Sequence, residues 1–252
     1  MNWIQKIRLC RKAGGVVMGI AWLFTLFSCM QQVIWEEGEE ITRYVRTVDY
    51  DTIEFRGIFD VLLVPDTAAF VKITCGENLI NYVRTHQKRG YIEVSETGRM
   101  NWTRSYKRTF VEMHFSRIHH ICIHEGVKMT SKGIVKTPFL SVWDNSGVSE
   151  TDLKVECTGF KLSVSDDNFG IYRISGNARF TCLEPDGSAH FRMADLVTDS
   201  CHISHKGIGD CQVNVTRVLQ GEISSTGTVL YKSYPSLLVN LRKGQGRLIA
   251  QP

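Results

Sequence analysis

The chain of 252 residues has little of what marks helical proteins and common enzymes. Only five prolines occur, and no segment keeps a helical period of apolar residues over three turns. The sequence contains no Gly-x-Ser-x-Gly nucleophile elbow, no glycine-rich phosphate loop and no paired Cys-x-x-Cys motif. These absences argue against nucleophilic catalysis and give a zinc centre little support. We therefore expect no catalytic residue, metal site or cofactor.

The chain also lacks an excess of one charge once its N-terminus is set aside. Residues 1–28 hold four of the 30 basic residues and none of the 26 acidic ones, so residues 29–252 carry equal numbers of both. A body without net charge lacks the basic stripe that nucleic-acid binding normally needs. Nucleic acid is therefore not an expected partner.

What the N-terminus does contain is an export signal. Basic residues between Lys6 and Lys12 are followed by an uncharged apolar stretch that ends in Ser28 and Cys29. A cysteine after a small residue resembles the lipobox of bacterial lipoproteins, whose thiol carries the lipid. We expect residues 1–28 to be a signal peptide and Cys29 to be the lipidated first residue of the mature chain. The alternative is an uncleaved signal anchor, because the 18 uncharged residues 13–30 can just span a bilayer.

Beyond Cys29 the sequence predicts an acidic tether over residues 29–44 and an all-β domain over residues 45–252. Glu36, Glu37, Glu39 and Glu40 form a charged run without apolar periodicity, which is typical of a solvated linker. The rest is rich in short runs of β-forming residues separated by glycine. One short helix is expected over residues 79–85.

Glycines at polar turns recur in the second half of the domain at intervals that average near 20 residues. They are Gly147, Gly170, Gly187, Gly209, Gly227 and Gly246. Short strands repeated at this period indicate a solenoid, in which each coil buries its apolar side against its neighbours. We predict a right-handed parallel β-helix-like solenoid with an N-terminal β-rich portion. A β-sandwich is the alternative, because its strands also recur at short intervals.

Six cysteines follow Cys29, an even number that permits disulfides in an exported protein. Several lie among strand-forming residues, and a domain of this length does not need disulfides for its core. Burial as small hydrophobic side chains is the favoured interpretation. The sequence leaves any pairing open.

Two groups of residues suggest chemistry, and each has a plainer explanation. His120, Cys122 and His124 would share one side of a strand and are all zinc ligands. However, neighbours on one side of a strand are about 7 Å apart, too far for all three to reach one metal ion. Asp144, Asp167 and Asp186 lie near turn glycines and could stack into a carboxylate column that cleaves polysaccharides. Capping of the turns is the alternative role.

Several segments in order resemble one known family. They are residues 51–61 (DTIEFRGIFDV), 76–80 (GENLI), 90–92 (GYI), 219–231 (LQGEISSTGTVLY) and 243–248 (KGQGRL), with Pro235 between the last two. The chain resembles the family called "putative auto-transporter adhesin, head GIN domain". The resemblance covers residues from about 44 to the end and implies an exported, β-helical, non-enzymatic surface domain.

We therefore expect a non-enzymatic envelope lipoprotein with an adhesin-like binding or scaffolding role at the cell surface or in the periplasm. Its expected partners are the membrane, through the lipid, and a surface glycan or envelope protein. The location is the cell envelope, at the outer membrane or facing the periplasm. Two other functions remain open: a carbohydrate-active enzyme that uses the turn carboxylates, and a structural or signalling accessory of the envelope.

Overall fold

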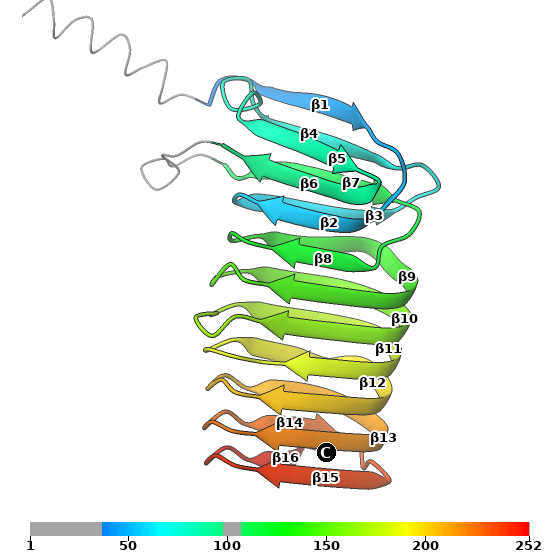
Figure 1. Ribbon diagram of the computed structural model, residues 1–252, viewed down its shortest axis with the longest axis vertical. Helices are drawn as coiled ribbons and strands as arrows, with labels where there is room; N and C mark the ends of the chain where they lie inside the picture. The colour runs from blue at the N-terminus through cyan, green and yellow to red at the C-terminus, as the bar shows by residue number, and fades with distance from the viewer. Residues whose placement is uncertain (1–36, 98–106, 252) are drawn as a thin grey trace, which may run out of the picture.

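The structure, a computed structural model, describes residues 37–97 and 107–251. Within these ranges the chain forms strands and turns, and none of it is helical (Figure 1). It follows that no helix in this part of the chain could cross a membrane. The strands are β1 (Glu40–Arg46), β2 (Tyr50–Arg56), β3 (Phe59–Pro65), β4 (Phe70–Gly76), β5 (Val83–Lys88), β6 (Gly90–Glu96), β7 (Thr109–Phe115), β8 (His120–Ile123), β9 (Lys128–Asp144), β10 (Glu150–Val164), β11 (Ile171–Glu184), β12 (His190–His205), β13 (Cys211–Ile223), β14 (Val229–Lys232), β15 (Leu237–Arg242) and β16 (Leu248–Gln251).

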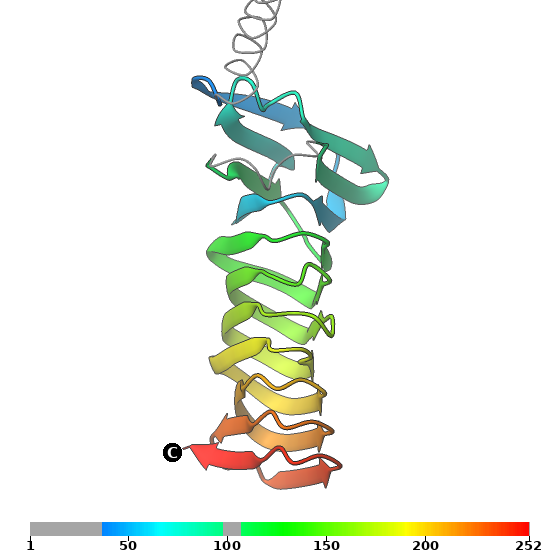
Figure 2. The same ribbon diagram turned by 90° about the vertical axis from the view of Figure 1, so that its left-hand side faces the viewer.

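The second half of the chain is a two-sided β-solenoid. The long strands β9 to β13 pair in parallel, each with the next, and every one bends at its middle so that it contributes to both faces (Figures 1 and 2). Register partners on successive coils lie between 17 and 22 residues apart. This spacing confirms the predicted solenoid, and parallel pairing of consecutive coils is not the antiparallel pattern of a β-sandwich.

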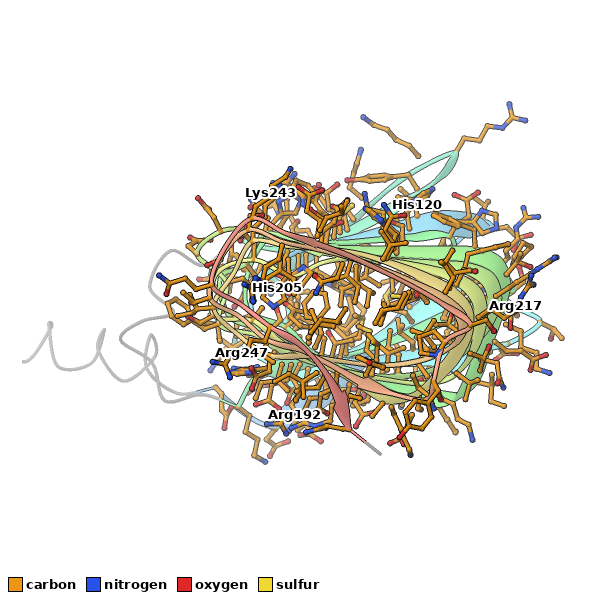
Figure 3. The ribbon with its side chains drawn as sticks, turned by 90° about the horizontal axis from the view of Figure 1, so that it is seen from below. His120, Arg192, His205, Arg217, Lys243 and Arg247 are labelled. Carbon is orange, nitrogen blue, oxygen red and sulfur yellow. The ribbon has the colours of Figure 1, made fainter. Side chains whose placement is uncertain are left out.

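The two faces are defined by their strand order. The first face holds β1, β4, β7, β3, the first halves of β9 to β13, then β14 and β16. The second face holds β5, β6, β2, β8, the second halves of β9 to β13, and β15. Seen along its axis the solenoid is flat, and His120 points outward from one face and Arg192 from the other (Figure 3).

The core lies between the faces and is built by alternation along each strand. In β10, Leu153 and Val155 are buried from the first face, and Phe160 and Leu162 from the second. The residues between them point outward and stay at least partly exposed. Because side chains of a strand alternate in direction, a bend between the two halves lets one strand supply apolar side chains from both sides.

The strands of the N-terminal portion continue both faces of the solenoid but do not follow chain order, and some of them pair antiparallel. On the first face β3 lies between β7 and β9, and on the second face β2 lies between β6 and β8. Beyond them β4 pairs antiparallel with β7 and with β1, while β5 pairs antiparallel with β6. These antiparallel strands cover the first coil, so the core is closed at this end.

Two local predictions are wrong in this portion. Residues 40–44, expected in the acidic tether, belong to β1, because their backbone pairs with residues 72–76 of β4. Residues 79–85 do not form a helix: the chain turns after Gly76 and enters β5 at Val83. There Val83 and Thr85 pair with β6, and this tertiary pairing overrides the local preference.

The turn glycines meet two different requirements. Gly147 and Gly187 have positive φ angles of 74° and 56°, which a side chain disfavours. Gly227 has no such angle, but a β-carbon there would lie 2.6 Å from the carbonyl oxygen of Gly209. Close stacking of successive turns therefore requires this glycine.

Candidate functional site

Of the residues that the sequence singled out, Asp144 lies inside the core. Its side chain is fully buried, and its two oxygens accept hydrogen bonds from the Tyr172 hydroxyl (2.7 Å) and the Ser146 backbone N–H (2.8 Å). Burial, and then the neighbouring Asp144 carboxylate, raise the pKa of Tyr172, so the phenol remains a donor. Asp144 thus holds a turn against the core and does not face a substrate.

The other two aspartates cap their own turns. Asp167 accepts a hydrogen bond from the Ser165 hydroxyl at 2.8 Å, and Asp186 accepts one from the Gly187 backbone N–H at 2.8 Å. Asp167 is exposed whereas Asp144 is buried, so the hypothesis of an aligned catalytic column is wrong. In residues 37–97 and 107–251, no group of three histidine, cysteine, aspartate or glutamate side chains is placed to hold a metal ion. Cys29 lies outside the described residues.

The outward side of β8 does carry the predicted series of His120, Cys122 and His124, because buried Ile121 and Ile123 alternate with them. The two histidines contact different partners. His124 Nε2 lies 2.7 Å from the Glu54 carboxylate, while the His120 ring lies 6.2 Å from the ring of Phe139. Strand alternation therefore places them on one side but does not join them in one centre.

Around Cys122 and His124 the structure assembles polar and aromatic side chains from four neighbouring strands of the second face. In register across the strands, Glu54 is opposite both Glu93 and Cys122, and Cys122 is opposite Trp143. We call this group the Glu54–Trp143 cluster. Its members are Glu54 and Arg56 of β2, Tyr91 and Glu93 of β6, Cys122 of β8 with His124 just after it, and Trp143 of β9.

Glu54 is the centre of the polar contacts in this cluster. The Tyr91 hydroxyl donates to its Oε2 at 2.6 Å, and Arg56 and His124 lie against its Oε1. Burial alone would raise the pKa of Glu54, but the Tyr91 hydrogen bond and the charges of Arg56 and His124 outweigh it and lower that pKa. Arg56 Nε also lies 3.3 Å from Glu93, so one guanidinium bridges two carboxylates.

Trp143 gives the cluster an exposed aromatic surface. Its side chain is 44% exposed, and the His124 ring stands edge-on to it at 5.9 Å and 83°. Two further exposed aromatic residues, Phe139 and Phe180, extend along the outer side of the same face. The guanidinium of Arg179 lies 5.2 Å from the ring of Phe180. The second face thus presents aromatic rings beside fixed charged groups.

The cysteines offer no reactive thiolate near this surface. All six in the described ranges are free thiols, and Cys75, Cys201 and Cys211 are buried, as the favoured interpretation expected. Burial, and then the Glu54 charge, raise the pKa of Cys122. Burial also raises the pKa of Cys157 to about 11. Cys122 beside His124 is therefore a protonated thiol and not an activated nucleophile.

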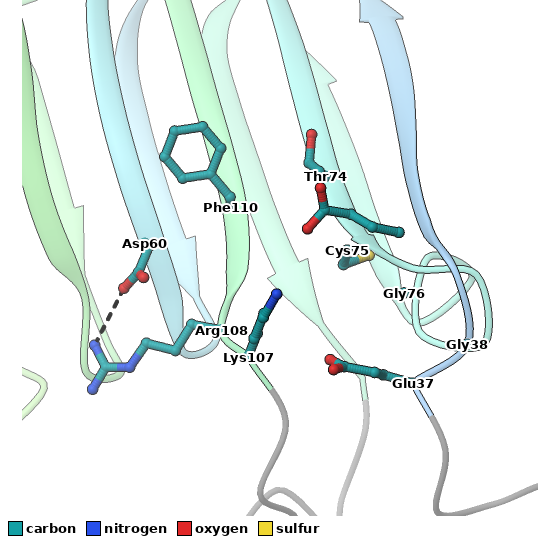
Figure 4. Close-up of a pocket in the computed structure, with 10 residues that line it drawn as sticks. Glu37, Gly38, Asp60, Thr74, Cys75, Gly76, Lys107, Arg108 and Phe110 are labelled. Atoms are coloured by element: carbon teal, nitrogen blue, oxygen red, sulfur yellow. Dashed lines mark ion pairs between the residues drawn. The ribbon is translucent and has the colours of Figure 1, made fainter.

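A hollow of about 500 Å³ lies on the outer side of the first face near the N-terminal end (Figure 4). Its lining combines acidic Glu37 and Asp60, basic Lys107 and Arg108, and the ring of Phe110. Asp60 and Arg108 are paired at 3.7 Å across an exposed surface, where such pairs contribute little. The hollow offers charges of both signs but none of the fixed geometry that surrounds Glu54.

Comparison with protein families identifies the fold. The family model described as "putative auto-transporter adhesin, head GIN domain" matches residues 49–235. The chain belongs to this family. The match confirms the resemblance seen in the sequence, and it includes every residue of the Glu54–Trp143 cluster.

Solved structures agree with this head GIN fold. A putative adhesin from Bacteroides fragilis aligns with a TM-score of 0.78 at 17% identity, over 84% of this chain and 97% of that one. A putative adhesin from Parabacteroides merdae gives 0.64 at 18%, over 85% and 97%. A putative lipid binding protein from Parabacteroides distasonis gives 0.62 at 16%, over 85% and 98%. At these identities the likeness shows the fold alone. Comparison with curated proteins finds no match.

Sequence reasoning missed the cluster in this head GIN domain, although it noted the strands that contain its residues. Glu54 and Arg56 alternate with buried Ile53 and Phe55, which shows that they point outward. Nothing in that pattern indicates that Tyr91, His124 and Trp143 lie beside them. Only the pairing of β2 with β6 and β8, and of β8 with β9, brings these side chains together.

Proposed function

We propose that this head GIN protein is a non-enzymatic lipoprotein of the cell envelope, anchored through Cys29, with an adhesin-like binding or scaffolding role at the cell surface or in the periplasm. The family description and the adhesins among the structural neighbours support this role. The sequence pattern around Cys29 supports the anchor.

The observation that carries the proposal is the set of exposed aromatic side chains on the second face. Phe139, Trp143 and Phe180 are 42%, 44% and 49% exposed on a face built from paired strands. Aromatic residues with polar neighbours are enriched where proteins bind partners, since they contribute large contact areas. A surface held by a continuous sheet is already ordered, so binding loses little conformational freedom.

The alternative of a polysaccharide-cleaving enzyme has less support. It relied on a column of turn aspartates, and Asp144 is buried while Asp167 and Asp186 bond within their own turns. An acid and a base for glycoside cleavage must both reach the scissile bond. The aspartates do not present such a pair on the surface.

The test measures binding of the full-length protein, in mild detergent, to immobilised envelope polysaccharide and envelope protein fractions. We expect saturable binding that falls about tenfold when Phe139 and Phe180 are both replaced by serine. The matched control replaces two exposed turn residues, Val148 and Phe169, by serine and should leave binding unchanged. Absence of binding to every fraction, or release of new reducing ends from a polysaccharide panel, would contradict the proposal.

A further inference from the structure

We propose that the Glu54–Trp143 cluster is a binding site for a neutral pyranose ring of an envelope glycan. This inference rests on the proposed binding function and adds the site and the chemical class of its ligand. It is carried by an exposed indole, two carboxylates and a guanidinium that strands β2, β6 and β9 hold in one patch, with β8 between β2 and β9.

Trp143 provides the apolar side of the site. A pyranose ring has one face of C–H groups and a rim of hydroxyls, so it needs a flat apolar surface next to hydrogen-bonding groups. The Trp143 indole is half-buried and packs edge-on against the His124 ring. His124 is in turn held by Glu54, whose carboxylate lies 2.7 Å from its Nε2. The indole, which we call the platform, is therefore oriented before any ligand binds.

The spacing of the strands sets the distance between the Trp143 platform and the polar groups around Glu54. Glu54 on β2 and Trp143 on β9 are the register partners of Cys122 on the strand between them. Neighbouring strands are about 4.8 Å apart, so the two flanking positions are about 10 Å apart. The His124 ring contacts both sides, with Nε2 2.7 Å from Glu54 and the ring centre 5.9 Å from that of Trp143, so the imidazole links the indole to the carboxylate.

The polar groups match hydroxyls, which both donate and accept hydrogen bonds. The Arg56 side chain is 49% exposed and Glu93 is 24% exposed, so a donor and an acceptor adjoin each other at the surface. Tyr91 and His124 fix Glu54 beneath them. Ligand sites typically combine one apolar wall with a few such convergent polar groups.

The charge of the cluster selects against acidic sugars. Glu54 and Glu93 are two carboxylates beside one arginine, Arg56, and one histidine, His124. The one permanent positive charge, Arg56, is already paired with both carboxylates, so a uronate would add a third carboxylate without a free partner and would bind less well. A neutral hexose has no such penalty, which is why we assign the site to neutral pyranoses.

The experiment is isothermal titration calorimetry of the full-length protein with maltohexaose, cellohexaose and mannohexaose, and with oligogalacturonate as the acidic comparison. We expect wild type to bind at least one neutral hexasaccharide. Trp143→Ala should weaken that binding about tenfold or more, while Trp143→Phe keeps a flat ring and should stay within about threefold. Phe169→Ala, an exposed aromatic on a turn, is the matched control and should change nothing.

Three results would overturn the inference: no neutral hexasaccharide binds, Trp143→Ala binds as tightly as wild type, or oligogalacturonate binds more tightly than every neutral ligand. The unfolding midpoint of each variant shows whether it is still folded. Trp143→Phe shows whether a flat aromatic ring at this position is enough for binding. If Trp143→Ala still attaches to envelope fractions while the Phe139 and Phe180 double variant does not, the adhesin-like role stands without this sugar site.

Discussion

Replacement of Gly227 by alanine tests whether close stacking of turns stabilises the solenoid. Gly227 lies between β13 and β14, and its N–H donates to the carbonyl of Gly207 at 3.2 Å. A β-carbon at this position would lie 2.6 Å from the Gly209 carbonyl oxygen and 2.7 Å from that of Gly207, and closer still to the His205 ring. Contacts under 3.0 Å are essentially never seen, so the turn or the ring must move.

The loss in the free energy of unfolding can be estimated from the displacement of the turn and of the His205 ring. Forcing a methyl group into packed structure costs about 1–3 kcal/mol. Displacing His205 breaks its 2.8 Å hydrogen bond to the Gly209 carbonyl, and leaving such buried partners unpaired costs about 1–3 kcal/mol. The alanine also restricts the unfolded chain, which offsets about 0.4–1 kcal/mol. Gly227→Ala should therefore lower the free energy of unfolding by about 1–5.5 kcal/mol.

The assay is urea denaturation followed by circular dichroism, with Gly221→Ala as the matched control. Gly221 is a buried glycine on β13, and the nearest atom to its added β-carbon would be Leu248 Cδ2 at 4.0 Å. We expect this control to stay within about 0.5 kcal/mol of wild type. Equal unfolding midpoints for the two variants would refute the argument from turn stacking.

Three further predictions concern individual side chains. Asp144→Asn should cost about 1 kcal/mol more in urea denaturation than Asp167→Asn, because Asp144, unlike Asp167, accepts a hydrogen bond from the buried Tyr172 hydroxyl. Burial lowers the pKa of His205 below its ordinary 6.5, so the unfolded chain takes up the proton first. Stability should fall as pH drops through about 6.5 toward the folded pKa, and His205→Gln should lack this component. Cys29→Ser should abolish labelling by a radioactive fatty acid.

Each of the three has an outcome that contradicts it. Equal costs for the two asparagine variants would mean that the buried aspartate is replaceable. The difference in the free energy of unfolding between wild type and His205→Gln should change between pH 7 and 5. If it does not, His205 is not a buried neutral histidine. Equal labelling of wild type and Cys29→Ser, with the precursor retained in the membrane, would favour the uncleaved signal anchor.

Much of the solenoid could be predicted because each coil pairs with the next one along the chain. The glycine period near Gly147 and Gly187 and the alternation of strands such as β10 are local features, and the register partners lie 17–22 residues apart. The sequence also placed His120, Cys122 and His124 on one side of a strand, since alternation alone decides that.

The N-terminal portion could not be predicted in the same way. Its strands pair out of chain order, with β3 between β7 and β9 and β2 between β6 and β8. An acidic run gave no sign that residues 40–44 would pair as β1, and local preference wrongly favoured a helix over residues 79–85. Backbone pairing is open to almost any side chain, so the sequence does not specify which distant strand a segment will meet.

By itself the sequence determined the strand content, the coil period, the outward direction of alternating side chains and the family. Only the tertiary structure decided that Glu54 would accept a hydrogen bond from Tyr91 and contact Arg56 and His124. It also decided that the His124 ring would pack against Trp143 of the next strand, β9. It also decided that Asp144 would be buried. The physical reason is that alternation along a strand is fixed residue by residue, whereas neighbours across a sheet depend on the register between strands far apart in the chain.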